Sequence, residues 1–551
     1  MNKDNLEKSA QLVMLSAESE SALAAELMQL RARLDDSSHA LDDVASALQK
    51  CRRDLPFRMA LACDSVDDLR AALTNPARQH KAPVNENAKR RVVFLFPGAG
   101  VQHSGMGRDL YRQESVFRDA VESCCVFLRE LGADDVLPAF LARHGDEEVS
   151  AAIRATSRSG VCIFVYQYAM LRLLASIGVS PDVVIGHSLG EYACAVASGA
   201  LNFQDALTLM HVRGTLLENL KEPGSMLLVA ESHSVVAGLL EKGTVITARN
   251  GPRSIIVSGP IAAIDTLAQR FEARGISFHR IRYGAASHCY LVEPVLPKFA
   301  ATLAGCSLRA PEITWISTVT ATRQPTDVVV DANYWCRQFR EPVLFSEAVG
   351  AVADEDQVLF LEIGPHNGLT NLVKSNVAGA TVICCGQHAN DVRDGRLAML
   401  DGLGALWVQG VALTYESGCV ALAQSIGKST SSLQNSQMPE ASPIASTDIS
   451  VPNERSVSNV EFVVRGVWEA MFDIECVGLE ENFFDLGGHS LLAVRINSEL
   501  RALFQLELPL SVQFENPTVR GLAKALLAVG HTRNVDVEAI AAALREVSEM
   551  P

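Results

Sequence analysis

Short apolar runs alternate with longer helix-like stretches between residues 91 and 425. The run at 92–96 predicts a buried strand, and residues 159–177 predict a helix. Residues 183–185 predict a second strand, which is followed by a helix at 191–199. Strands that alternate with helices form a mostly parallel sheet covered by helices. We therefore expect an α/β core in this region.

A different order of elements interrupts this core. The pattern predicts strand, helix, strand, strand, helix and strand, at residues 226–230, 235–241, 245–248, 254–258, 262–273 and 277–282. This β-α-β-β-α-β order is typical of a ferredoxin-like fold. We expect an inserted ferredoxin-like subdomain at about residues 224–284.

The N-terminal part predicts a small α/β unit at residues 1–90. Helix-like stretches and one strand-like run occur in it, at 19–34, 40–49 and 66–73 for the helices and 58–63 for the strand. Residues 79–90 are polar and contain a proline, which predicts a connector.

The C-terminal part predicts helices only. Helical patterns at 460–472, 490–504 and 519–527 suit an all-α four-helix bundle at residues 457–530. Residues 426–456 are rich in Ser, Thr, Pro, Gln and Asn and predict a flexible tether. Residues 531–551 are expected to form a C-terminal tail. The chain is thus expected to be multidomain.

Composition and charge narrow the classes of function. The 551 residues are 48% hydrophobic and 20% charged, which is typical of globular domains and excludes global disorder. The net charge is −16 without a basic run, so we expect no nucleic-acid partner. The most apolar stretch, 161–174, is shorter than a membrane span and contains Gln167 and Arg172, so we expect no membrane association.

The N-terminus and the cysteines point to a location. The first residues carry charges of both signs and have no apolar segment typical of a secretory signal. The 13 cysteines include no C-x-x-C motif. This pattern predicts reduced thiols in the cytoplasm, without a disulfide framework or a metal site.

A candidate nucleophile lies between a predicted strand and a predicted helix. Ser188 is the centre of the sequence GHSLG at 186–190. Glycines on both sides allow the sharp turn of a nucleophile elbow, and the following helix N-terminus stabilises developing negative charge. The alternative is an ordinary tight turn. A serine nucleophile needs a base, and the spacing of the histidines alone does not identify it.

Six short motifs occur in order along residues 91–425: FPGAGVQ at 96–102, GHSLGEY at 186–192, NGP at 250–252, ASH at 286–288, VEP at 292–294 and LEIGPH at 361–366. With these motifs the region resembles the acyltransferase domain of modular polyketide synthases and the malonyl-CoA:acyl carrier protein transacylases, which implies an α/β hydrolase-like acyltransferase core. The order and spacing of these motifs match the family.

The resemblance implies roles for individual residues. It places the base at His288, held by a backbone carbonyl, with His187 as a neighbour in the elbow. It implies that Arg213 binds the free carboxylate of a malonyl-type substrate. The alternative is that Arg213 is an ordinary surface or salt-bridged arginine of a helix. The backbone N–H groups of Ala99 and Leu189 would form the oxyanion hole. Gln102 and Ser287 would be further substrate-binding residues.

Three positions depart from the family's pattern toward smaller side chains. Ala99 stands where relatives usually have Gln, and Gly160 stands in the place of the Gln of a Gln-Pro pair. Ser287 ends the sequence AAS at 285–287, which matches neither the malonyl-selecting nor the methylmalonyl-selecting motif. Leu189 is more often found with malonyl, so the specificity signals conflict. We hypothesise a pocket enlarged for a C2-substituted malonyl unit.

A second serine belongs to another motif. Ser490 ends DLGGHS at 485–490 and opens a predicted helix. It resembles the phosphopantetheine attachment site of acyl and peptidyl carrier proteins; the alternative is a simple helix cap. The resemblance implies that Ser490 carries a covalent 4'-phosphopantetheine whose thiol accepts the acyl group.

The N-terminal part contains LVMLSA at 12–17 and DLPFR at 54–58. With these segments, residues 1–90 resemble the linker between a ketosynthase and an acyltransferase. The sequence therefore looks like a stand-alone acyltransferase–carrier pair of a polyketide or hybrid polyketide–peptide assembly line. The implied partners are an acyl-CoA substrate, a phosphopantetheinyl transferase, and a partner ketosynthase or other modules. Two alternatives stay open: a hydrolase that removes acyl groups from carriers, and a non-catalytic docking protein.

Overall fold

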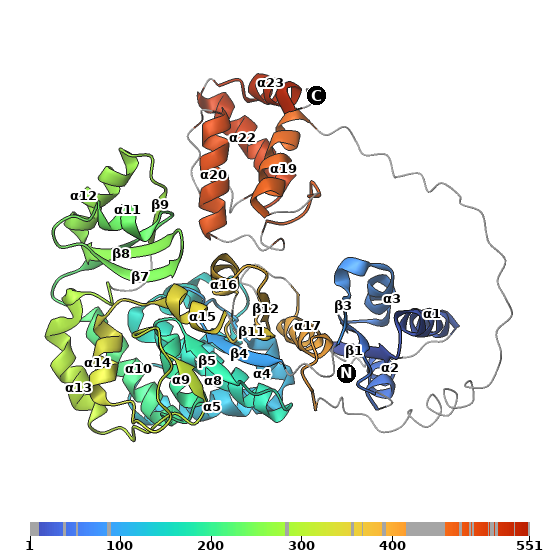
Figure 1. Cartoon of the computed structure of the whole chain (residues 1–551), viewed down its shortest axis with the longest axis horizontal. Helices are drawn as coiled ribbons and strands as arrows, with labels where there is room; N and C mark the ends of the chain where they lie inside the picture. The colour runs from blue at the N-terminus through green and yellow to red at the C-terminus, as the bar shows by residue number, and fades with distance from the viewer. Residues whose placement is uncertain are drawn as a thin grey trace. The chain divides into compact units, whose positions relative to one another are not determined.

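The structure, a computed structural model, describes most of the chain (Figure 1). It divides into two compact units. The larger comprises Met1–Leu228, Ser232–Leu267 and Arg280–Asn435; the smaller comprises Val229–Glu231, Ala268–His279 and Ser436–Pro551. The described residues are 10–36, 40–50, 53–84, 90–281, 286–353, 357–365, 367–387, 393–414, 458–472, 477–483, 486, 490–504, 506, 512, 516–533 and 535–548. The predicted tether at 426–456 lies outside them.

The core of the larger unit is a parallel five-stranded sheet, as the strand–helix alternation predicts. Its strand order is β10-β5-β4-β11-β12, and each neighbouring pair is parallel. The strands are β4 (Arg91–Phe96), β5 (Val183–Gly186), β10 (Thr314–Ile316), β11 (Val358–Glu362) and β12 (Thr381–Cys384). The predicted strands 92–96 and 183–185 are therefore the central strand β4 and its neighbour β5.

Helices cover both faces of this sheet because successive strand residues point in opposite directions. Phe94 of β4 joins the apolar cluster that includes Phe164 of α8, whereas Leu95 joins the cluster that includes Phe345 of α15. The helices are α4 (Arg108–Gln113), α5 (Ser115–Glu130), α6 (Leu137–Leu141), α7 (Glu147–Ala152), α8 (Thr156–Ser176), α9 (Gly190–Ala197), α10 (Phe203–Glu218), η2 (Tyr290–Val295), α13 (Leu296–Leu303), α14 (Ala332–Arg340), α15 (Phe345–Ala353), α16 (Thr370–Asn376) and α17 (Gly395–Val408).

A four-stranded sheet with two helices interrupts the core after α10. Its six elements occur in the predicted order, as β6 (Gly224–Val229), α11 (His233–Ala237), β7 (Val245–Gly251), β8 (Ser254–Pro260), α12 (Ile261–Glu272) and β9 (Phe278–Ile281). The strand order is β7-β8-β6-β9, with β7 and β8 antiparallel.

The N-terminal part forms an antiparallel sheet in the order β1-β2-β3. Its elements are β1 (Gln11–Ala17), α1 (Glu20–Asp36), α2 (Leu41–Lys50), β2 (Phe57–Cys63), α3 (Val66–Thr74), η1 (Pro76–Arg78) and β3 (His80–Pro83). The segment 79–90 was expected to be a connector, but its residues His80–Pro83 form the strand β3 at the edge of this sheet. These four residues pair with β2 although their side chains show no apolar alternation.

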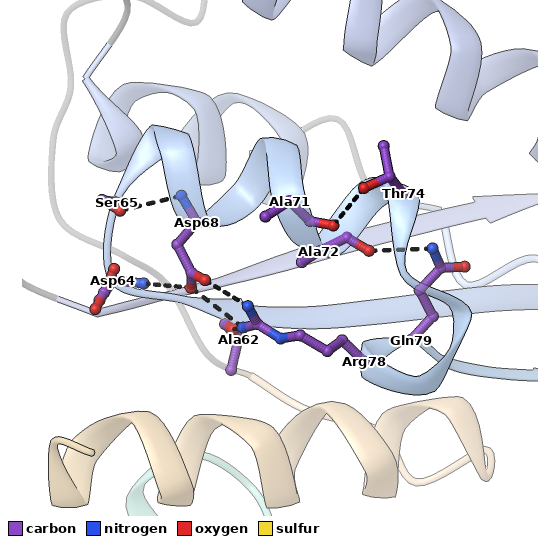
Figure 2. A network of polar contacts seen from close by, with 9 residues as sticks. All are labelled: Ala62, Asp64, Ser65, Asp68, Ala71, Ala72, Thr74, Arg78 and Gln79. Carbon is purple, nitrogen blue, oxygen red and sulfur yellow. Dashed lines mark hydrogen bonds and ion pairs between the residues drawn. The ribbon is translucent and has the colours of Figure 1, made fainter. Parts of the chain in front are cut away.

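A polar network closes the turn between α3 and β3 (Figure 2). The guanidinium of Arg78 contacts both carboxylate oxygens of Asp68, one at 3.1 Å, and donates to the backbone oxygen of Ala62 at 3.1 Å. The hydrogen bond from Arg78 lowers the pKa of Asp68. Ser65 caps α3 by accepting from the N–H of Asp68. The network ties α3 to the end of β2.

Helix α17 joins this N-terminal sheet to the α/β core. Leu12 of β1 and Ala60 of β2 share one apolar cluster with Leu403 of α17. Arg58 donates to the backbone oxygen of Trp407 at 3.0 Å, and its guanidinium lies 5.1 Å from the centre of the indole. The N-terminal sheet is therefore packed against the core rather than held only by a connector.

The C-terminal part of the chain has its own apolar core. Its described helices are α19 (Asn459–Phe472), α20 (Ser490–Phe504), α22 (Val519–Arg533) and α23 (Val537–Ser548). Trp468, Ile496 and Leu526 are buried in it. Residues 531–551 were expected to be a tail, but Val537 and Ala541 of α23 are 2% and 0% exposed in the same core. The helical unit therefore extends beyond residue 530.

One described helix, α8, has the length and apolar composition that a membrane span needs. However, 78% of its most apolar window is buried inside the protein. Core helices of globular proteins have the same character.

Candidate active site

Ser188 lies in a sharp turn between β5 and α9, at the carboxyl end of an inner strand. Its φ is 52°, in the left-handed region that non-glycine residues rarely adopt. The turn requires glycine at its end, because a Cβ on Gly190 would lie 1.9 Å from the backbone oxygen of Phe96. At the other end, a Cβ on Gly186 would lie 2.4 Å from the amide nitrogen of Glu191. The glycines therefore allow the backbone of the turn to pack closely, at Gly190 against the backbone of Phe96, and the turn presents the serine hydroxyl.

His288 is the histidine that the fold brings to this hydroxyl. Its Nε2 lies 2.6 Å from Ser188 Oγ, and its Nδ1 lies 2.9 Å from the backbone oxygen of Glu341. The carbonyl holds the proton on Nδ1 and leaves Nε2 free to accept a proton from the serine. Burial, together with the positive charge of Arg213, lowers the pKa of His288 to about 3. The imidazole is therefore neutral at physiological pH.

His187, the other histidine of the elbow, has a different partner. Its Nε2 lies 2.8 Å from Oδ1 of Asn250, and its ring packs edge-on against Phe345. The backbone oxygen of Asn250 accepts from the side-chain amide of Asn376 at 2.7 Å. His187 therefore links the elbow to β7 and α16, whereas His288 contacts the serine hydroxyl.

Arg213 of α10 is a buried cation that faces the same pocket. Its side chain is 3% exposed, and burial lowers its pKa. Among the residues that the structure describes, Nε and Nη2 of Arg213 have no hydrogen-bond partner. Its guanidinium carbon lies 4.6 Å from the centre of the Phe339 ring. A buried charge without a counter-ion is costly, so this site suits an anionic ligand.

The pocket brings together most of the residues that the sequence singles out. It is lined by Ala99, Thr156, Ser159, Gly160, Ser188, Leu189, Met210, Arg213, Gly214, Leu217 and Ser287. Gln102 is not among these lining residues; its Oε1 accepts from the N–H of Gly100 at 2.8 Å. The backbone N–H groups of Ala99 and Leu189 donate to no acceptor within the described parts of the chain.

Gly160 shapes one wall of this pocket. A Cβ at Gly160 would lie 3.0 Å from Cε of Met210 and 3.2 Å from Cδ1 of Leu189. These distances are shorter than ordinary van der Waals contacts, so the two side chains occupy the space that a larger residue would need.

Two further groups brace the elbow, and sequence reasoning assigned them no role. Gln338 donates from Nε2 to the backbone oxygen of Ser188 at 2.7 Å. The buried carboxylate of Glu191 accepts from the N–H of Thr318 at 2.6 Å and from the hydroxyl of Tyr334 at 2.8 Å. Burial raises the pKa of Glu191 to about 7. The position of Glu191 in the GHSLGEY motif was a usable signal; nothing local marks Gln338.

A serine at a strand–helix elbow, hydrogen-bonded to a neutral histidine, is the arrangement of serine-dependent acyl-transfer enzymes. Family models agree with this class. The model described as "Acyl transferase domain" matches residues 93–412, so the chain belongs to the acyl transferase domain family. The model "Phosphopantetheine attachment site" matches residues 463–526, and "CurL-like, PKS C-terminal" matches residues 11–73.

Curated relatives are polyketide synthases. Polyketide synthase GfsA of Streptomyces halstedii is 31% identical over 510 residues, which cover 86% of this chain and 7% of that protein. A phenolphthiocerol/phthiocerol polyketide synthase of Mycobacterium tuberculosis is 29% identical over 533 residues, which cover 88% of this chain and 35% of that protein. The chain thus spans about a third or less of the length of these relatives.

Solved structures of acyltransferase domains share the fold. The acyltransferase domain of SpnD, in complex with 2-(pent-4-yn-1-yl)malonyl, is 31% identical with a TM-score of 0.66 and covers 73% of this chain and 96% of its own. That of ZmaA is 26% identical with a TM-score of 0.68 and covers 74% of this chain and 96% of its own. The chain is thus an acyltransferase of the polyketide synthase type joined to a carrier domain, whose cofactor is a covalent 4'-phosphopantetheine.

The described residues of the carrier fit this cofactor. Ser490 is the first residue of the 15-residue helix α20. Free backbone N–H groups at a helix N-terminus suit a phosphodiester. The motif residues directly before Ser490 lie outside the described residues.

Proposed function

We propose that this chain transfers a malonyl-type acyl group from CoA, through an acyl-Ser188 ester, to the phosphopantetheine thiol of its own or a partner carrier domain. One observation carries the proposal. Within the described part of the chain, one pocket is bordered by Ser188, whose hydroxyl contacts His288, and by Arg213, whose buried Nε and Nη2 are unpaired. A thioester carbonyl at the serine and a carboxylate at the arginine match these groups.

In the first half-reaction, Ser188 Oγ attacks the thioester carbon and His288 Nε2 takes its proton. The N–H groups of Ala99 and Leu189 stabilise the negative oxygen of the tetrahedral intermediate. The carbon–sulfur bond then breaks, and the CoA sulfur leaves with the proton from His288. Arg213 holds the carboxylate throughout, so it orients the acyl group rather than activating it.

In the second half-reaction, the same groups act in the reverse direction. Phosphopantetheine attached to Ser490 supplies the acceptor thiol. His288 takes the thiol proton, the ester oxygen of Ser188 is the leaving group, and His288 returns the proton to it. Two successive transfers through one serine predict ping-pong kinetics.

We further propose that the acyl group has a substituent at C2. Gly160 supports this because it lines the pocket without a side chain, and a larger residue there would displace Met210 or Leu189, which line the same pocket. Ala99 and Ser287 add small side chains to the same pocket. The SpnD domain, a structural relative, is in complex with a malonyl group that bears a pentynyl substituent.

A competition among acyl-CoA thioesters tests both parts. The phosphopantetheinylated chain is incubated with acetyl-, malonyl-, methylmalonyl- and ethylmalonyl-CoA in equal amounts, and the masses on Ser188 and the carrier are measured. We expect a dicarboxylic acyl group to dominate, with a substituted one in excess. Preferred loading of acetyl would contradict the binding of the carboxylate by Arg213. Preferred loading of plain malonyl would contradict only the proposal that the acyl group has a substituent at C2.

Finer assignments accompany this function. The strand order β7-β8-β6-β9 supports a ferredoxin-like subdomain, and the shared core of α19, α20 and α22 supports a helical-bundle carrier. Residues 1–90 would act as a ketosynthase-to-acyltransferase linker, supported by the match at 11–73. We also propose that the chain acts in polyketide or hybrid polyketide–peptide biosynthesis, in the cytoplasm. Its proposed protein partners are a phosphopantetheinyl transferase and a ketosynthase.

A further inference from the structure

The end of α14 and the residues after it contact both members of the catalytic pair. Gln338 Nε2 donates to the backbone oxygen of Ser188 at 2.7 Å. The backbone N–H of His288 donates to the carbonyl of Phe339 at 3.2 Å, and its Nδ1 lies 2.9 Å from the carbonyl of Glu341. Residues 338–341 therefore hold the nucleophile and the base.

The side chain of Phe339 contacts the third functional group. The guanidinium carbon of Arg213 lies 4.6 Å from the ring centre, and Phe339 and Arg213 are 0% and 3% exposed. Within the described residues, Nε and Nη2 of Arg213 have no hydrogen-bond partner. An aromatic face attracts a cation through its quadrupole without occupying any N–H group. The ring thus fixes the guanidinium and leaves its donors for a ligand.

A hydrogen-bonding residue in the place of Phe339 would have the opposite effect. A carboxylate or amide oxygen would orient Arg213 but would also compete with the substrate for its N–H groups. An aliphatic residue would leave the donors free but would not attract the cation. The aromatic ring is the side chain that satisfies both requirements.

We propose that Phe339 is a positioning residue for Arg213 and, through it, a determinant of the preference for acyl groups with a free carboxylate. The inference rests on the proposed function, in which Arg213 binds that carboxylate. Because the backbone of Phe339 also holds His288, one residue sets the position of the carboxylate relative to the base.

Phe299 provides a matched control. Its ring packs edge-on against Phe339 with centroids 5.1 Å apart, and it is 0% exposed. Phe299→Leu therefore removes the same type of side chain from the same apolar cluster, without removing the ring beneath Arg213. A loss caused only by poorer packing affects both variants alike.

The test measures kcat and KM for acylation of Ser188 by malonyl-CoA and by acetyl-CoA in the full chain. We expect Phe339→Leu to lower kcat/KM for malonyl-CoA by about tenfold, mainly through KM, and to leave acetyl-CoA within about twofold. Phe339→Tyr keeps the aromatic face and should retain the malonyl preference. Phe299→Leu should leave the malonyl-to-acetyl ratio unchanged, and thermal unfolding reports the stability of each variant.

An equal malonyl-to-acetyl ratio in the wild type, Phe339→Leu and Phe299→Leu would overturn the inference. Phe339→Met, which also removes the ring, replaces Phe339→Leu if the latter does not fold. Arg213→Gln separates the inference from the function on which it rests. If Arg213→Gln abolishes the malonyl preference and Phe339→Leu does not, only the positioning role fails. If neither changes the ratio, the carboxylate-binding role of Arg213 fails.

Discussion

Ser188 and Ser490 both stand at the start of a helix, but their surroundings differ. Ser188 has a left-handed backbone and a histidine Nε2 at 2.6 Å, and its carbonyl accepts from Gln338, 150 residues away in the chain. Ser490 opens α20 inside a region that a carrier-family model matches as a whole. Ser188 is thus held in position by residues that are distant in the sequence. We therefore expect changes near Ser188 to affect the acylation chemistry, and changes around Ser490 to affect its modification by the proposed phosphopantetheinyl transferase.

Removing the base should separate the two serines most sharply. In His288→Ala we expect acylation of Ser188 to fall by about a thousandfold or more, because no other described side chain bonds to its hydroxyl. Attachment of phosphopantetheine to Ser490 should continue at the wild-type rate. Intact-protein mass spectrometry measures both modifications on one sample. Loss of both would mean that the substitution unfolds the chain.

Arg213→Gln should have the next largest effect. Loss of a charged donor to a carboxylate in a buried site is expected to lower kcat/KM for malonyl-CoA by about a hundredfold. Acetyl-CoA lacks the carboxylate, so its kcat/KM should not fall. The measurement is single-turnover acylation with each thioester. An equal loss for both would assign Arg213 to the structure of the site rather than to the substrate.

Gly160→Ala should change selectivity rather than rate. The added Cβ would lie 3.0 Å from Met210 Cε and would displace this side chain, which lines the pocket. We expect about a tenfold loss for ethylmalonyl-CoA relative to malonyl-CoA. Gly350→Ala in α15 is the control, because nothing lies within 4 Å of its Cβ position. If both variants keep the wild-type selectivity, Gly160 does not limit the size of the acyl group.

The pH dependence of acylation should show the smallest change. Protonated His288 cannot accept the serine proton, and burial lowers its pKa from 6.5 to about 3. The neutral base therefore persists as the pH falls, so the His288 contribution to kcat/KM should stay constant from pH 8 to about pH 5. The pH profile of acylation is measured by stopped flow in Glu191→Gln. This substitution removes the nearby carboxyl, whose pKa is raised to about 7 and whose titration would otherwise overlap that of a His288 with an ordinary pKa. A decline with a midpoint near 6.5 in this variant would contradict a depressed pKa.

The elements that the sequence predicted well are those defined by local pattern. The strands β4 and β5, the elbow at Ser188 and the order of the inserted elements follow from apolar periodicity and glycines. Strands β1 and β3 were missed. β1 contains a short continuous apolar run, which periodicity alone does not distinguish from a buried helix segment. β3 forms because the edge of β2 is available to it.

The partners of Ser188 required more than local pattern. His288 lies 100 residues away, and only family resemblance selected it among the histidines. Gln338 and Phe339 contact the site through the packing of α14, which no short motif encodes. Their roles become visible only when the tertiary contacts are known.

The central claim is that the acyl group passes through Ser188. It is tested most directly by incubating Ser490→Ala and Ser188→Ala with a malonyl-type CoA thioester and mapping the acylated peptide by mass spectrometry. The account predicts an acyl group on Ser188 in Ser490→Ala. In Ser188→Ala it predicts no acyl group on the peptide that contains position 188 or on the carrier. An acylated carrier in purified Ser188→Ala would contradict it.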